Sequence, residues 1–204
     1  MLLTPDEAGI AQVSELAVEG HPSIKIFLSF HRFDRHVAGY LQAMTAAAKA
    51  GSVVLVHCED PGIMHCCGHA LDEAGHTEAE HYPKSRPVEA ERIATERAVG
   101  YCATTGATTY VVHLSSQAAL AACRTGRARG LPLHVETRPI YLHLNEDRFF
   151  EADGAKYAGA PPLRTDADRD ALWAGISDGT VSTVCTDHAP VSYTHLTLPT
   201  ILLV

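Results

Sequence analysis

Four side chains that can bind metal ions or move protons are associated with four separate apolar runs. Lys25 lies inside the first run, His57 and His113 directly follow the next two, and Asp187 comes two residues after the last. Short β-branched runs of this kind predict buried strands. If the strands are parallel, their carboxyl ends meet at one edge of a sheet. One amine, two imidazoles and one carboxylate could then converge around a buried metal centre.

Each of these residues also has an ordinary structural interpretation. Lys25 could point outward from an edge strand, His57 and His113 could be satisfied core histidines, and Asp187 could cap a turn. If Lys25 is buried, however, its pKa falls, and a neutral amine near a metal can take up carbon dioxide as an anionic carbamate. Glu59 could orient His57 from the other side of the ring. The coincidence of all four groups at strand ends favours the metal centre.

Other clusters of reactive residues are weaker candidates. The run His65-Cys-Cys-Gly-His69 resembles a metal knuckle, but its pattern is helical and no second pair stands at finger spacing. His76 and His81 are expected to be solvated in a polar loop. Ser115 follows His113 without the G-x-S-x-G elbow of a serine hydrolase.

Composition limits the class of protein. The chain has 204 residues, 46% hydrophobic, which suffices for one core, and its net charge of −8 argues against nucleic-acid or anionic-membrane partners. No apolar run reaches the ~18 residues of a membrane helix, and the N-terminus lacks a signal-peptide pattern. The six cysteines do not have the spacing of a secreted scaffold. We therefore expect a cytoplasmic protein with reduced thiols.

The elements that must position the four groups alternate along the chain. Strands are expected at 23–28, 53–56, 109–112, 132–135 and 181–185, and helices at 6–19, 36–50, 63–73, 88–105, 117–129 and 166–177. A polar loop is expected at 75–87 and a loop-rich stretch at 138–164. This alternation predicts parallel βαβ units of the α/β class. A doubly wound sheet would show the same alternation but would gather its ligands near one switch point. Five strands cannot close an eight-stranded barrel, so the prediction is a partial (β/α)8 barrel.

Several motifs, taken together and in order, resemble the dihydropyrimidinase/hydantoinase branch of the amidohydrolase superfamily. The motifs are Ser23-Ile-Lys-Ile-Phe-Leu28, Val56-His-Cys-Glu59, Ser85-Arg-Pro87, Tyr110-Val-Val-His-Leu-Ser-Ser116, Val135-Glu-Thr-Arg-Pro-Ile-Tyr-Leu142, Gly154-Ala-Lys-Tyr157, Pro161-Pro-Leu-Arg164 and Thr186-Asp-His-Ala-Pro190. The resemblance covers nearly all of residues 1–190. It implies a partial TIM barrel of the metal-dependent amidohydrolase type, containing about the last five βα units.

The resemblance also implies an activity and a site. The activity is hydrolysis of a C–N bond in a cyclic amide such as a hydantoin or dihydropyrimidine, through a hydroxide that bridges two divalent ions, expected to be zinc. Lys25 matches the carboxylated lysine between the two metals, and His57 and His113 match ligands of the second metal. Asp187 matches the aspartate that binds the first metal and carries the proton, and backbone groups at Ala160 match those that hold the substrate. The intact protein is expected to be a homo-oligomer, a tetramer or dimer, and its partner a small cyclic amide.

Three departures from the family pattern qualify these expectations. The His-x-His pair of the family's first strand is absent, and Phe30 stands where a tyrosine is usual. Residues 191–204 resemble translated sequencing-adapter read-through, so we expect a non-native tail after a barrel segment at 1–190. The chain by itself is therefore expected to be an inactive fragment.

Other functions remain compatible with these residues. Dihydroorotase and allantoinase are the nearest rival activities within the same fold. A non-catalytic scaffold relative is the alternative from another class. Such relatives have typically lost their metal ligands, so the retention of Lys25, His57, His113 and Asp187 argues against a scaffold.

Overall fold

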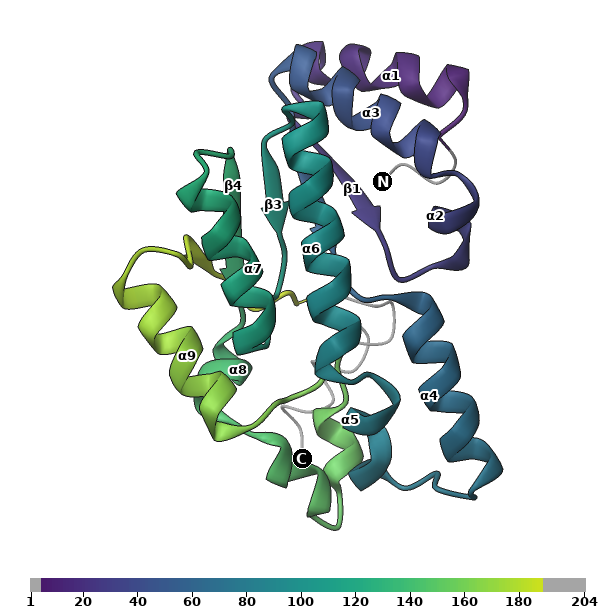
Figure 1. The fold of residues 1–204 in the computed structure, drawn as a ribbon, viewed down its shortest axis with the longest axis vertical. Helices are drawn as coiled ribbons and strands as arrows, with labels where there is room; N and C mark the ends of the chain where they lie inside the picture. The colour runs from purple at the N-terminus through teal and green to yellow at the C-terminus, as the bar shows by residue number, and fades with distance from the viewer. Residues whose placement is uncertain (1–4, 189–204) are drawn as a thin grey trace, which may run out of the picture.

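The sheet is parallel and follows the order of the chain. The computed structural model describes residues 5–188, and its five strands are arranged β1-β2-β3-β4-β5. Figure 1 shows β1, β3 and β4 of this sheet. The strands are β1 (Ser23–Phe27), β2 (Val53–His57), β3 (Thr109–Val111), β4 (Leu133–Thr137) and β5 (Thr183–Val184). Each strand pairs in parallel with the next. The predicted α/β class with sequential βα units is confirmed.

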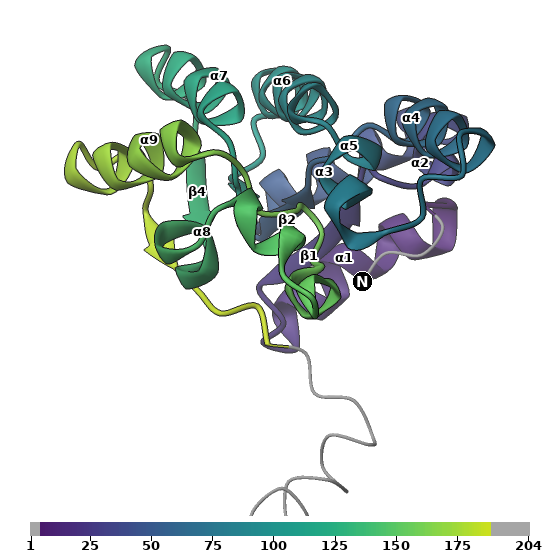
Figure 2. The ribbon, with the colours of Figure 1, turned by 90° about the horizontal axis from the view of Figure 1, so that it is seen from below.

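The strands have a helix-covered face and a second, more open face. Ile26 pairs with Val56, Val56 pairs with Val111, and Val111 pairs with Val135, and all four side chains are buried. Because side chains alternate along a strand, Lys25 lies on the opposite face. Figure 2 shows α4, α6, α7 and α9 in an arc around the strands. This is the arrangement of a barrel wall, with helices outside and polar groups on the inner face.

The helices begin and end where the sequence supplies caps. They are α1 (Glu7–Val18), α2 (His31–Arg35), α3 (Val37–Ala50), α4 (Pro61–Glu73), α5 (Tyr82–Ser85), α6 (Val88–Thr105), α7 (Gln117–Ala128), α8 (Pro139–His143) and α9 (Asp166–Ser177). Thr165 and Asp168 form a capping box at the start of α9, and the Ser116 side chain accepts the Ala119 N–H at the start of α7. Gly106 ends α6 in the left-handed conformation.

One hydrophobic core joins the sheet to its outer helices. Leu120 from α7 and Leu172 from α9 are fully buried in the same cluster as the strand residues Val54 and Val135. Within the described part of the chain, no helix is long and apolar enough to cross a membrane.

Three sequence-based predictions about the elements need correction. The run 181–185 was expected to be buried, but β5 is two exposed residues at the edge of the described sheet, paired only with β4 there. The stretches 75–87 and 138–164 were expected to be loops. They contain α5, α8 and the 3₁₀ turns η1 (Ala79–His81), η2 (Glu146–Phe150) and η3 (Gly154–Tyr157). The expected tail at 191–204 lies outside the described residues.

Candidate metal centre

Two imidazoles meet at the carboxyl ends of β2 and β3. His57 is the last residue of β2, and His113 lies two residues beyond β3. His57 Nδ1 is 3.0 Å from His113 Nε2, and the ring centroids are 4.7 Å apart at 71°. Both residues are buried. The structure therefore brings together two of the four predicted ligands.

A carboxylate orients the first imidazole. Glu59 Oε2 lies 2.7 Å from His57 Nε2, and Glu59 is fully buried. Arg86 Nε donates to Glu59 Oε1 at 2.9 Å, and its Nη2 donates to Oε2. Burial alone would raise the pKa of Glu59, but the hydrogen bonds from His57 and Arg86 outweigh it and lower the pKa to about 2. An ionised Glu59 assigns the proton of His57 to Nε2, which leaves the Nδ1 lone pair facing His113.

His113 is held as a neutral base. Burial lowers its pKa to about 3, and the neighbouring His57 and Lys25 act in the same direction. Its Nδ1 is buried without a hydrogen-bond partner among the described residues. The backbone N–H of His113 donates to Glu136 Oε1 at 3.0 Å, and its φ of 39° is positive. Strain of this kind at a non-glycine residue is typical of functional positions.

Lys25 is electrostatically coupled to His113. It lies in β1, in register with Leu55 of β2. Burial lowers the pKa of its amine, while the negative charges of Asp187 and Glu136 act in the opposite direction. Its Nζ is 5.2 Å from the centroid of the Phe27 ring. A half-buried amine with a lowered pKa is the state that the carbamate hypothesis requires.

The other two predicted site residues, Asp187 and Ala160, lie outside the helices and strands. Asp187 is exposed beyond β5 with a φ of 54°, and its charge acts on Lys25. Ala160 precedes Pro161 through a cis peptide bond. The carbonyls on either side are fixed by tyrosines, since Tyr82 Oη donates to Gly159 O at 2.9 Å and Tyr141 Oη donates to Pro161 O at 2.6 Å. The structure thus holds the chain around Ala160 without a contact to the imidazole pair.

Comparison with known proteins identifies the fold and the branch. No protein-family model matches the chain. D-phenylhydantoinase of Escherichia coli O9:H4 (strain HS) is 34% identical over 188 residues, which is 92% of this chain and 41% of that protein. The structure of D-hydantoinase (dihydropyrimidinase) from Thermus sp. superposes with a TM-score of 0.84 at 32% identity, over 96% of this chain and 43% of that one. D-hydantoinase from Bacillus sp. AR9 gives a TM-score of 0.85 at 29% identity, over 92% and 42% of the two chains.

The chain matches part of a hydantoinase-type amidohydrolase barrel. It spans about 41% of the length of the curated hydantoinases it resembles. The resemblance inferred from the motifs is therefore confirmed, and so is the partial TIM barrel. These relatives are a D-phenylhydantoinase, a D-hydantoinase and a dihydropyrimidinase.

The imidazole pair suits a divalent transition metal. His57 Nδ1 and His113 Nε2 face each other at 3.0 Å. Neutral imidazole nitrogens are ligands that zinc-type ions prefer, and a carboxylate on the far ring nitrogen of one ligand is the usual outer partner. Glu59 supplies that carboxylate to His57. The donor set therefore fits a zinc-type ion.

Sequence reasoning missed two residues that support the site. Glu136 accepts from the His113 backbone and, through Oε2, from Tyr110 Oη at 2.7 Å. Arg86 neutralises the buried Glu59. The signal for Glu136 was its position at the end of a buried strand, whereas no local pattern pairs Arg86 with Glu59, 27 residues away.

Two further expectations can be compared with the structure. Phe30 is 58% exposed, its ring centroid 5.5 Å from that of Phe27, and it offers no hydrogen-bond donor where the family has a tyrosine. The run from His65 to His69 lies within α4, as its helical pattern predicted. His76 is exposed, as predicted, whereas His81 is half-buried, and the two side chains belong to a compact cluster described below.

Proposed function

We propose that the intact protein hydrolyses a C–N bond in a cyclic amide of the hydantoin or dihydropyrimidine type. The observation that carries the proposal is the His57–His113 pair, with its 3.0 Å nitrogen–nitrogen approach and the Glu59 carboxylate behind His57. The similarity to hydantoinases over 92% of the chain supports the same reaction class. Because the chain spans only part of those enzymes, the activity belongs to a protein with the complete barrel.

Specific residues of the chain would hold the metal ions. His57 and His113 would ligate one ion, a carbamate on Lys25 would bridge to a second, and Asp187 would ligate that second ion. We propose zinc for both. When bound, the two ions would polarise the amide carbonyl. They would also lower the pKa of a bound water to about 7, as zinc does in known enzymes.

The remaining steps fall to side chains of this chain. Glu59 keeps the His57 proton on Nε2, so that Nδ1 stays available as a ligand. The lowered pKa of Lys25 increases the fraction of neutral amine, and the neutral amine adds to carbon dioxide at Nζ and releases one proton. Asp187 accepts a proton from the attacking water and returns it to the leaving amide nitrogen. Backbone groups at Ala160 hold the ring of the substrate.

The test is mutagenesis in a protein where this segment is part of a complete barrel. Asp187→Asn should leave the metal largely bound, because the amide oxygen can still act as a ligand, and should lose at least about 100-fold in kcat, because general acid–base catalysis contributes that much. Lys25→Ala should lose both bound metal and activity. Asp170→Asn, at an exposed position on α9, is the matched control and should be unaffected. An active Asp187→Asn variant would refute the assigned proton transfer.

A substrate panel separates the rival activities. Hydantoin and dihydrouracil should be hydrolysed faster than dihydroorotate and allantoin. Metal analysis separates the enzyme from a non-catalytic scaffold, since a scaffold would bind no ions at His57 and His113.

The remaining proposals concern the whole protein. They are a cytoplasmic, homo-oligomeric enzyme, one barrel segment at 1–190 and a non-native tail at 191–204. An ordinary coding sequence under 191–204, distinct from adapter sequence, would remove the proposal about the tail.

A further inference from the structure

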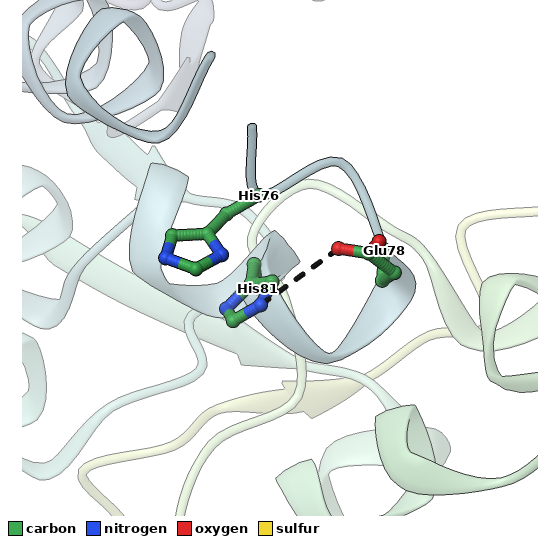
Figure 3. Close-up of side chains that lie close together, drawn as sticks. All are labelled: His76, Glu78 and His81. Atoms are coloured by element: carbon green, nitrogen blue, oxygen red, sulfur yellow. Dashed lines mark ion pairs between the residues drawn. The ribbon is translucent and has the colours of Figure 1, made fainter. Parts of the chain in front are cut away.

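A second group of metal-ligand residues lies between α4 and α5. The ligand atoms of His76, Glu78 and His81 all lie within 4.8 Å of one another (Figure 3). The His76 and His81 ring centroids are 4.2 Å apart, and His81 Nε2 lies 3.9 Å from Glu78 Oε2. Among the described residues, this is the set of three His, Cys, Asp or Glu side chains that meets this distance limit. His57, His113 and Asp187 are not part of it.

The local backbone explains why these side chains meet. Gly75, with a φ of 71°, follows the end of α4 and turns the chain back. Glu78 precedes η1 and His81 ends it, so the two stand three residues apart on one helical turn. Glu80 Oε1 is also 3.4 Å from His81 Nε2. His76 and Glu78 are exposed, and the group borders a cavity of about 320 Å³, so an ion could reach it from solvent.

The donor set selects the class of ion. Two imidazoles and one carboxylate suit Zn²⁺, Co²⁺, Ni²⁺ or Cu²⁺, whereas Mg²⁺ and Ca²⁺ prefer oxygen ligands alone. An ion about 2.0–2.2 Å from each ligand atom places those atoms no more than about 4.4 Å apart. The exposed side chains of His76 and Glu78 need only a small closure to reach that spacing.

Lys84 opposes the binding of a cation at this group. Its Nζ lies 3.4 Å from His81 Nδ1, where it can donate only to a nitrogen without a proton. His81 then carries its proton on Nε2, the nitrogen that faces Glu78. Binding an ion at Nε2 moves that proton to Nδ1, so the contact with Lys84 must break. The removal of Lys84 should therefore strengthen metal binding.

The group is also linked to the candidate metal centre through the segment that follows it. Tyr82 donates to Gly159 O next to Ala160, and Arg86 holds Glu59 against His57. An ion bound at His76, Glu78 and His81 would fix the start of this segment.

We propose that His76, Glu78 and His81 form a second binding site for a divalent transition-metal ion, which braces the segment carrying Tyr82 and Arg86. The site shares no residue with the proposed catalytic centre. Its role is structural or regulatory, and it does not depend on the reaction that the intact protein performs.

The experiment is calorimetric titration of the chelator-treated chain with zinc chloride. His76→Ala/His81→Ala should lose one equivalent of bound zinc, or lower its affinity at least 10-fold, relative to the unsubstituted chain. Glu78→Gln should weaken the same binding event. Lys84→Gln should tighten it, which a nonspecific surface histidine pair does not explain. His21→Ala, an exposed histidine elsewhere, is the matched control.

Two further measurements keep this site separate from the catalytic centre. His57→Ala/His113→Ala should retain the binding event that His76→Ala/His81→Ala removes. Zinc should also slow amide hydrogen exchange over residues 79–86 in the unsubstituted chain but not in His76→Ala/His81→Ala. Equal zinc stoichiometry and affinity in that double variant and the unsubstituted chain would overturn the proposal, as would a chain that binds no zinc outside His57 and His113.

Discussion

His57 Nε2 lies 2.7 Å from a carboxylate oxygen of Glu59, although the two residues are only two positions apart in the sequence. The chain leaves β2 at His57 and turns so that Glu59 reaches the outer nitrogen of the ring. Arg86, which lies between α5 and α6, supplies the positive charge that compensates Glu59. The position of His57 Nδ1, and with it the proposed ligand, therefore depends on a buried ion pair.

Replacement of Glu59 by glutamine should weaken both the fold and metal binding. The change keeps the volume but removes the charge opposite Arg86, and it replaces one of the two carboxylate oxygens that accept from His57 and Arg86 with an amide donor. We expect a loss of about 2–4 kcal/mol in the free energy of unfolding, in the range for a broken buried ion pair. Zinc affinity at the imidazole pair should fall about 10–100-fold, as for other outer-sphere partners. Urea titration and calorimetry measure the two effects.

The matched control for that change is Glu96→Gln. Glu96 also pairs with an arginine, Arg92, at 2.7 Å, but both side chains are substantially exposed. Its loss should cost at most about 1 kcal/mol. Equal losses in Glu59→Gln and Glu96→Gln would show that burial of the Glu59 pair contributes nothing.

Acid should destabilise the chelator-treated protein through His113. The pKa of this imidazole is lowered from 6.5 to about 3, so between these values the unfolded chain binds a proton that the folded chain does not. Stability therefore falls as the pH drops, by up to about 1.4 kcal/mol per pH unit from this group. His113→Gln should reduce the difference in unfolding free energy between pH 7 and pH 5, and His21→Gln should not. An unchanged pH dependence in His113→Gln contradicts the prediction.

The sequence predicted most of the fold because local signals and global topology agree. Helix α9 begins and ends where its pattern indicates, because Thr165 and Asp168 form a capping box. The burial of the run 181–185 was predicted wrongly. An apolar run shows that a strand can be buried, but it does not show whether other elements cover that strand. Val184 is 48% exposed at the sheet edge. The short helices in 75–87 and 138–164 were missed because elements of three to five residues lack a measurable period.

The site was predictable only in part. The meeting of His57 and His113 follows from the adjacency of β2 and β3, which the βαβ pattern supplies. The pairing of Arg86 with Glu59 depends on a tertiary contact with no sequence periodicity. The compact group at His76 was taken for a solvated loop, because the sequence does not show that η1 turns His81 back toward it.

Lys25 should take up carbon dioxide when zinc is present. A neutral amine is required, and burial lowers the pKa of Lys25. Incubation with ¹³C-labelled bicarbonate and zinc should give a carbamate resonance in the carbonyl region of the ¹³C spectrum. Lys25→Arg should abolish that resonance, because a guanidinium is always protonated. Lys49→Arg, at an exposed position on α3, should retain it. A resonance that persists in Lys25→Arg would assign the carbamate to another amine.

Two glycine substitutions should have opposite effects on stability. A Cβ at Gly126 in α7 would lie 2.9 Å from Val99 Cγ1 and 3.2 Å from Leu133 Cδ2, where α7 packs on α6 and β4. Gly126→Ala should therefore lower the free energy of unfolding by about 1–3 kcal/mol, the range for overpacking. A Cβ at Gly100, exposed in α6, meets nothing within 4 Å. Gly100→Ala should raise stability by about 0.4–1 kcal/mol, because alanine restricts the unfolded chain. Urea unfolding midpoints at constant m-value measure both changes, and a stabilised Gly126→Ala would show that the α6–α7 contact is looser than the structure indicates.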